Sequence, residues 1–265
     1  MSGLRISING AAGRMGQRLI ALASQDDDLQ LSSAIEWSEH PQFGNDAGEI
    51  AGVGNLDLPL CNEIAEGTQA VIDFSVPAGA ETIVNRCSEQ QIPLVMATTG
   101  LSDSQQQLVR DASNTIPIVW APSMSMAVNL TMKLSTIAGE ILKNTLGGAD
   151  VEILERHHRF KEDAPSGTAL RFGNLIAEAM DINNHVHGRE GQTGARTNDE
   201  IGYHAIRTGD NPGEHTIVFG MLGETIELTV RASNRDCYAL GALQAAKFVA
   251  TQSPGLYGMN DVLGL

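Results

Sequence analysis

The chain has 265 residues, enough for two modest domains or one large domain with its own apolar core. Hydrophobic residues make up 42% and charged residues 18%, a composition typical of globular proteins rather than disordered ones. The formal net charge of -15 argues against nucleic acid and anionic membranes as partners, and an aromatic content of only 4% argues against base stacking. Any anionic ligand must therefore bind in a local basic pocket.

The cysteines and the N-terminal sequence indicate a cytoplasmic protein. Cys61, Cys87 and Cys237 are far apart and show no metal-ligand spacing, which predicts reduced thiols and no metal site. No basic stretch followed by a long apolar region opens the chain, so no signal peptide is expected. The apolar runs are shorter than a membrane span, so no membrane association is expected.

Short apolar runs alternate with stretches of helical period through the first half of the chain. The predicted strands are 4–8, 31–36, 70–74, 94–97 and 116–120, and the predicted helices are 15–24, 79–90 and 102–113, with Ser102 as a cap. Alternating strands and helices imply parallel pairing through crossover helices. The fold class is therefore α/β, with an N-terminal Rossmann-like doubly wound parallel sheet.

The pattern changes near Asn129. A helix over 130–142 leads to a strand at 151–154, and a polar, glycine-rich stretch covers 180–200. Strand-like runs follow at 201–207, 216–220 and 225–232, and a last helix is predicted over 238–252. Consecutive strands with short turns favour a smaller α+β domain with a mostly antiparallel sheet, after which the last helix could return to the first domain.

A glycine-rich turn follows the first predicted strand. Gly10, Gly13 and Gly16 are spaced as G-x-x-G-x-x-G immediately before a helix. Glycine allows the tight turn and a close approach to a pyrophosphate, which the helix N-terminus attracts. Glu36, twenty residues after Gly16, could accept hydrogen bonds from a ribose diol. The glycine spacing alone would also fit an ordinary strand-to-helix turn.

Three more segments follow predicted parallel strands. They are Asp73-Phe74-Ser75, Thr98-Thr99-Gly100 and Ala121-Pro122-Ser123. The carboxyl ends of parallel strands meet at one edge of the sheet, where small hydroxylated residues can line a nicotinamide ribose. Each segment by itself could be an ordinary turn.

A basic cluster stands out in this acidic chain. Residues that can carry positive charge are Arg156, His157, His158, Arg159 and Lys161. In a desolvated cleft they would attract carboxylates. Ser166, Gly167 and Thr168 open a helix, whose first N–H groups form a second anion site. His157 and Lys161 beside such a site suit proton donation to a carboxylate-bearing substrate.

Plainer interpretations of this cluster remain open. The charge run could be a solvated loop, and Ser166 could be only a helix cap. Metal chelation by adjacent His157 and His158 is disfavoured, because neighbours in an extended segment point to opposite faces. The remaining histidines of the second half are interpreted as structural or surface residues: His185, His187, His204 and His215.

The ordered series of these motifs resembles that of the dihydrodipicolinate reductases. The matching segments are Asn9-Gly-Ala-Ala-Gly-Arg-Met-Gly16, Asp73-Phe-Ser75, Ala97-Thr-Thr-Gly100, Ala121-Pro-Ser-Met-Ser125, Glu155-Arg-His-His-Arg-Phe-Lys161 and Asp163-Ala-Pro-Ser-Gly-Thr168, with Gly213-Glu-His215 and Ser233-Asn-Arg235 as later segments. They span the chain in the family's order, and the E-x-H-H-x-x-K…S-G-T block is highly specific to that family.

The resemblance implies an oxidoreductase that converts 4-hydroxy-tetrahydrodipicolinate to tetrahydrodipicolinate with NADH or NADPH, releasing water in the diaminopimelate route to lysine. It implies a dinucleotide-binding domain over 1–127 and 238–265, and a substrate-binding and oligomerisation domain over 128–237. It also implies a homotetramer, and a small dianionic cyclic substrate.

Roles follow residue by residue where the motifs match. His157 resembles the general acid that protonates a ring carbon, and Lys161 resembles its partner that stabilises developing charge. The implied substrate-binding residues are His158, Ser166, Gly167, Thr168 and Arg235. The implied cofactor-binding residues are Gly10, Ala11, Ala12, Gly13, Arg14, Met15, Gly16, Glu36, Phe74, Ala97, Thr98, Thr99, Ala121, Pro122, Ser123 and Met124.

Two positions depart from the family pattern. Many members carry arginine after the ribose-binding acid, where it grips the 2′-phosphate of NADPH, but Trp37 follows Glu36 here. A neutral indole cannot pair with a phosphate and Glu36 would repel one, which predicts a preference for NADH, although Arg14 could still reach a phosphate. Ser123 stands where asparagine is common.

Two other functions compete with this one. Another nicotinamide-dependent reductase on the same two-domain plan would keep the glycine turn but would not need His157, Lys161 and the 166–168 block. A non-catalytic dinucleotide sensor would bind NADH without needing a basic cluster poised to donate a proton.

Overall fold

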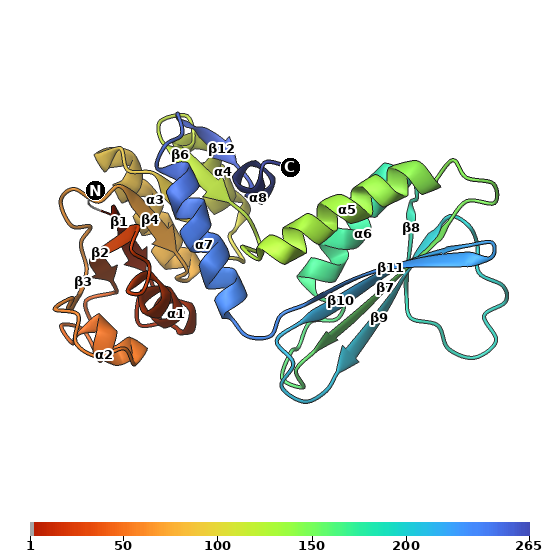
Figure 1. The fold of residues 1–265 in the computed structure, drawn as a ribbon, viewed down its shortest axis with the longest axis horizontal. Coiled ribbons are helices and arrows are strands. Elements are labelled where there is room, and N and C mark those ends of the chain that lie inside the picture. Colours follow the sequence, from red (N-terminus) through yellow and green to blue (C-terminus); the bar gives the residue numbers. More distant parts are fainter. Residues whose placement is uncertain (1–2) are drawn as a thin grey trace. The chain divides into compact units, whose positions relative to one another are not determined.

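The computed structural model describes residues 3–265, which form two compact units (Figure 1). The first unit contains the chain up to Met126 together with Arg235–Leu265, and the second contains Ala127–Asn234. The chain therefore leaves the first unit once and returns to it for its last elements. No helix within residues 3–265 is both long enough and apolar enough to cross a membrane.

A seven-stranded sheet forms the centre of the first unit. Its strand order is β12-β6-β5-β4-β1-β2-β3, and every pairing is parallel. The strands are β1 (Leu4–Asn9), β2 (Leu29–Ile35), β3 (Leu60–Cys61), β4 (Ala70–Asp73), β5 (Leu94–Met96), β6 (Pro117–Trp120) and β12 (Gly255–Tyr257). This order confirms the predicted Rossmann-like, doubly wound sheet, with a topological switch point between β1 and β4.

Helices cover both faces of this sheet (Figure 1). They are α1 (Arg14–Ala23), α2 (Ala47–Ala51), α3 (Pro77–Gln90), α4 (Asp103–Ala112), α7 (Asp236–Val249) and α8 (Met259–Leu263). α1 and α7 share one apolar core, while α3 and α4 contribute to another. Ser102 caps α4 as predicted, since its hydroxyl accepts the N–H of Gln105 and the Gln105 side chain accepts the N–H of Ser102.

α7 joins the first unit although it lies beyond the second unit in the sequence. Its buried face consists largely of small residues, which let it lie close against the sheet: Ala239, Gly241, Ala242, Ala245 and Ala246. A Cβ at Gly241 would lie 1.7 Å from the carbonyl oxygen of Met124, so only glycine fits there. The Arg18 guanidinium, on α1, also binds the Asp236 carboxylate at 2.7 Å.

The second unit is built on a five-stranded sheet with the order β11-β10-β7-β9-β8. Its elements are α5 (Met126–Leu142), β7 (Asp150–His157), α6 (Gly167–Met180), β8 (Asn184–His187), β9 (Glu200–Arg207), β10 (Glu214–Met221) and β11 (Glu224–Arg231). β10 pairs antiparallel with β11 and β7, but β9 pairs parallel with β7 and β8. The sheet is mixed: the antiparallel pairing expected for these strands holds at β10, but it was wrong for β9, and β8 was not predicted. The crossover through α6 and the long connection over 188–199 bring these strands back in the same direction.

Burial along β7 alternates with the two-residue period of a strand. Val151 and Ile153 enter the apolar core beneath α6, where Phe172 and Phe219 are also buried. The same face continues to the end of the strand with Glu155 and His157. The buried face of β7 therefore begins with apolar residues and ends with an acid and a histidine.

Candidate functional site

The glycine-rich turn lies between β1 and α1, as the sequence predicts. Gly10 has a φ of +77°, and a Cβ there would lie 2.8 Å from the carbonyl oxygen of Phe74. A Cβ at Gly16 would lie 2.2 Å from the carbonyl oxygen of Gly10. The first turn of α1 holds no acidic residue, so its N–H groups and helix dipole favour an anion. This backbone fits the pyrophosphate of a dinucleotide.

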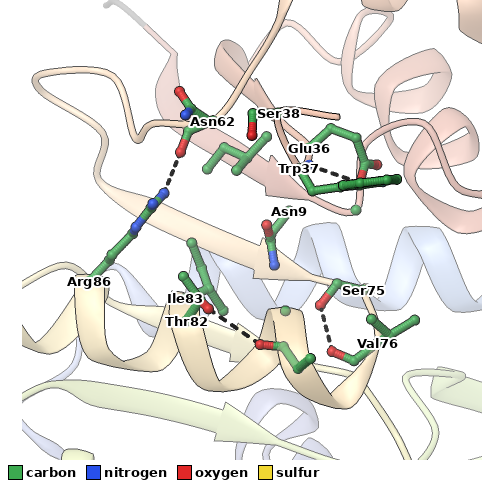
Figure 2. A pocket seen from close by; sticks show the side chains of 14 residues that line it. Asn9, Glu36, Trp37, Ser38, Asn62, Ser75, Val76, Thr82, Ile83 and Arg86 are labelled. Atoms are coloured by element: carbon green, nitrogen blue, oxygen red, sulfur yellow. Dashed lines mark hydrogen bonds between the residues drawn. The ribbon is translucent and has the colours of Figure 1, made fainter. Parts of the chain in front are cut away.

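A pocket of about 520 Å³ opens beside this turn (Figure 2). One wall follows β2 and consists of Glu36, Trp37 and Ser38, and the other comes from α3, up to Arg86. The Glu36 carboxylate accepts the N–H of Ala12 at 3.1 Å, which fixes it beside the glycine turn. The Arg86 guanidinium in the wall donates to the carbonyl oxygen of Asn62. Size and lining fit the adenosine half of a dinucleotide, with Glu36 near the ribose.

The other predicted cofactor residues lie at the carboxyl edge of the same sheet. Phe74, Ala97 and Ala121 directly follow β4, β5 and β6. Their environments differ: Ala97, Thr98, Ala121 and Met124 are buried, whereas Arg14, Thr99 and Pro122 are exposed. The structure therefore brings segments far apart in sequence to one edge.

Asp73 links neighbouring strands by hydrogen bonds at the topological switch point of this sheet. Its carboxylate accepts the Asn9 amide and the Thr98 hydroxyl, each at 2.6 Å, and joins the ends of β1, β4 and β5. Burial raises the pKa of Asp73 above its ordinary value, against the opposing hydrogen bonds. Thr98 therefore donates its hydroxyl hydrogen inward.

A second group of polar residues lies at the end of β7, in the second unit. His157 is 8% exposed, and its Nδ1 lies 2.5 Å from a carboxylate oxygen of Glu155, two residues earlier on the same face. Burial lowers the pKa of His157, while the hydrogen bond and the negative charge of Glu155 act in the opposite direction. A buried acid–histidine pair is thus held by one strand.

Glu155 binds further donors from other elements. The Arg207 guanidinium, at the end of β9, makes two hydrogen bonds to it at 2.7 and 2.8 Å. The backbone N–H of Ser166 makes another at 3.1 Å. Burial would raise the pKa of Glu155, but the hydrogen bonds from Arg207 and His157 outweigh it and hold the pKa below its ordinary value. The carboxylate is therefore ionised at neutral pH.

Ser166 is the N-cap of α6. Its hydroxyl accepts the N–H of Ala169 at 3.2 Å and lies 3.0 Å from Nε2 of His215. The His215 ring is buried, with its centroid 5.2 Å from that of His157. Burial lowers the pKa of His215 to about 4, which keeps this ring neutral near pH 7. The start of α6 and His157 thus share one polar network.

The remaining predicted substrate residues are distributed as follows. Gly167 and Thr168 are the first residues of α6, and Lys161 donates to the Asp163 carboxylate at 2.7 Å. His158 has a buried Nδ1 that binds no partner within residues 3–265. Arg235 is the exception, because it is the N-cap of α7 in the first unit.

Glu155, Arg207 and His215 were not predicted from the sequence as site residues, and His215 was interpreted as structural or surface. The alternation E-x-H in a strand would have paired Glu155 with His157. The others depend on contacts between residues about fifty positions apart, which periodicity does not reveal.

Within residues 3–265, no group of three or more His, Cys, Asp or Glu side chains is arranged to hold a metal ion.

Comparison with known proteins identifies the family of both units. Residues 4–124 match the family model for the N-terminus of dihydrodipicolinate reductase, and residues 127–263 match the model for its C-terminus. The chain belongs to the dihydrodipicolinate reductase family. Its N-terminal part is therefore the nucleotide-binding Rossmann domain of this family.

Several relatives of the family match over the whole chain. The 4-hydroxy-tetrahydrodipicolinate reductase of Rhodopirellula baltica is 56% identical, covering 99% of this chain and 96% of the relative. That of Syntrophotalea carbinolica is 44% identical, covering 99% of each. Among solved structures, the dipicolinate-bound dihydrodipicolinate reductase of Paenisporosarcina sp. TG-14 is 23% identical, with a TM-score of 0.77 over 98% of this chain and 99% of that one. At 23% identity, this similarity shows that the two proteins share a fold.

Proposed function

We propose that this protein reduces 4-hydroxy-tetrahydrodipicolinate to tetrahydrodipicolinate with NADH or NADPH, in the diaminopimelate route to lysine. The 4-hydroxyl group leaves as water together with one hydrogen from the ring, and one hydride and one proton are added to the ring. The full-length relatives support this assignment. The observation that carries it is the buried His157, joined through Glu155 to the capped start of α6.

The substrate is a dianion, and the second unit offers it positive charge and N–H donors. The α6 start at Gly167 presents backbone N–H groups, and a Cβ at Gly167 would meet open space, so an oxygen can approach closely. Lys161 and His158 lie on the segment that precedes α6, and Thr168 adds a hydroxyl. These residues of the second unit bind the carboxylates.

His157 donates the proton to the ring carbon, and Lys161 stabilises charge that develops on the substrate. Without substrate, burial lowers the pKa of His157 and favours its neutral form. A dianion bound beside the ring raises that pKa again, because opposite charge favours the protonated form. Protonation of His157 is thereby coupled to substrate binding.

The nicotinamide cofactor supplies the hydride. The chain holds its pyrophosphate with the turn from Gly10 to Gly16, and Glu36 accepts hydrogen bonds from the adenosine ribose. Trp37 is 56% exposed at the pocket wall and carries no charge for a 2′-phosphate. Arg86 lines the same pocket, but its guanidinium already binds a backbone carbonyl. These features support a preference for NADH.

The assembly proposed for this enzyme is a cytoplasmic homotetramer. The face of the second sheet that points away from its core exposes Leu154 and Ile206 on neighbouring strands. Such apolar side chains favour association of copies through this sheet. Light scattering coupled to gel filtration tests it, and a monomer at micromolar concentration would contradict it.

A coupled assay tests the activity. The preceding synthase generates the substrate from pyruvate and aspartate semialdehyde, and NADH oxidation is followed by absorbance. Rapid oxidation that requires the synthase is expected. Absence of oxidation with NADH and NADPH, by protein that binds NADH, would contradict the proposal and favour a dinucleotide sensor.

A further inference from the structure

Glu155 is 2% exposed, yet every side of its carboxylate is occupied by a donor. One oxygen accepts from Nδ1 of His157 and from Arg207, at 2.5 and 2.8 Å. The other accepts from the backbone N–H of Ser166 and from Arg207, at 3.1 and 2.7 Å. Burial of an ionised carboxylate is costly unless it is paired in this way.

The pairing fixes the orientation and the tautomer of His157. An ionised carboxylate only accepts hydrogen bonds, so the hydrogen of the neutral ring lies on Nδ1. Nε2 is then the nitrogen that takes up and delivers a proton. A Cβ at Gly213 would lie 3.0 Å from this atom, so glycine at this position leaves Nε2 uncovered.

We propose that Glu155 is a positioning residue. Through the two oxygens of its carboxylate, it fixes the proton donor His157 in position relative to the carboxylate-binding start of α6. This inference rests on the proposed function. The same side chain that orients His157 also holds the N-cap residue Ser166, so the two parts of the substrate site cannot shift independently. Arg207 serves the pair by keeping the carboxylate charged and in place.

The charged groups around His157 determine in which direction its pKa changes when Glu155 is neutralised. Glu155 faces it from its own strand, Arg207 from β9, His215 from β10 and Lys161 from the following segment. Among these groups, Glu155 alone carries negative charge and raises the pKa of His157, while the cations lower it. Neutralising Glu155 therefore lowers the pKa of His157.

The test compares Glu155→Gln with the wild type in the full chain. Histidine-selective isotope labelling and NMR titration, with His157 assigned from the spectrum of His157→Gln, report its pKa directly. We expect a fall on the order of one unit, and a kcat lower by about 10- to 100-fold. We also expect weaker binding of dipicolinate, used as a dicarboxylate probe, because the α6 start loses its anchor.

Two further variants separate positioning from folding. Glu152→Gln, on the same strand, removes a carboxylate that binds Arg189, Arg196 and His204 on the opposite face, and should leave the pKa of His157 unchanged. Glu155→Asp keeps the charge but is too short to hold both partners, so it should lower kcat with a smaller pKa change. It replaces Glu155→Gln as the test if that variant does not fold.

The outcomes distinguish this inference from the proposed function. An inactive wild type in the coupled assay would contradict the function, whereas the NMR titration still reports on Glu155. An active wild type with an unchanged pKa of His157 and unchanged kcat in Glu155→Gln would overturn the positioning role.

Discussion

The two regions that we propose as anion-binding sites differ in their chemical composition. The turn between β1 and α1 consists of backbone, and its decisive residues are glycines that have no side chain. The region around His157 consists of ionisable side chains that are buried and paired. Backbone N–H groups keep their polarity at every pH, whereas the second region depends on the protonation of each member. We therefore expect the first region to be sensitive to added side-chain volume, and the second region to changes in the charge of its side chains.

The largest expected effect comes from His157→Gln. Loss of the proton donor should lower kcat by about 10²- to 10⁴-fold, with little change in thermal stability. Steady-state kinetics and a melting curve measure both. His187→Gln, at an exposed position on β8, is the matched control. Near-normal turnover of His157→Gln would remove His157 from its assigned role.

Gly16→Ala tests the volume sensitivity of the first region. The added Cβ meets the Gly10 carbonyl oxygen, so the turn must open and the N–H groups must move. We expect the dissociation constant for NADH to rise by roughly tenfold or more, which corresponds to about 1.4 kcal/mol. Dipicolinate binding should be unaffected. Unchanged NADH affinity would show that the turn does not bind the cofactor.

The pH dependence of folding tests the charge sensitivity of the second region. His215 has a pKa of about 4 in the folded chain, lowered from 6.5 by burial. The unfolded chain takes up this proton first, so the free energy of unfolding should fall as the pH drops from about 6.5 to about 4. The contribution of His215 is on the order of 3 kcal/mol. Urea unfolding across this range measures it, and His215→Gln should show a shallower slope than the wild type.

The smallest expected effect concerns cofactor preference. In Trp37→Arg, a cation beside the pocket should improve kcat/KM for NADPH relative to NADH by roughly tenfold, because it can pair with the 2′-phosphate. Trp37→Gln controls for loss of the indole. A strong NADPH preference in the wild type would contradict the proposed use of NADH.

Local sequence patterns predicted much of the first unit. The alternation of strands and helices gave the parallel sheet, and the glycine spacing located the turn, because these features depend on neighbouring residues. The short elements β3, β8, β12, α2 and α8 were not predicted, since two to five residues carry too little periodicity. The direction of β8 and β9 depends on a long connection, which the sequence does not constrain.

In the candidate site, too, residues that are close in sequence were predicted and partners from distant strands were not. His157, Lys161 and the 166–168 block are close in sequence and could be named together, although their roles remain proposals. The partners of Glu155 come from β9 and from the start of α6, and His215 comes from β10. Such pairings arise only when strands distant in sequence become neighbours, so one sequence alone did not reveal them.

The place of α7 in the fold has a consequence for synthesis on the ribosome. Its small residues complete an apolar core with α1 and the first strands, but they are translated after the whole second unit. During translation the second unit can fold while one face of the N-terminal sheet still lacks its covering helix. The nascent chain therefore presents an unfinished apolar surface until its last thirty or so residues emerge, and this interval is when a chaperone would be needed most.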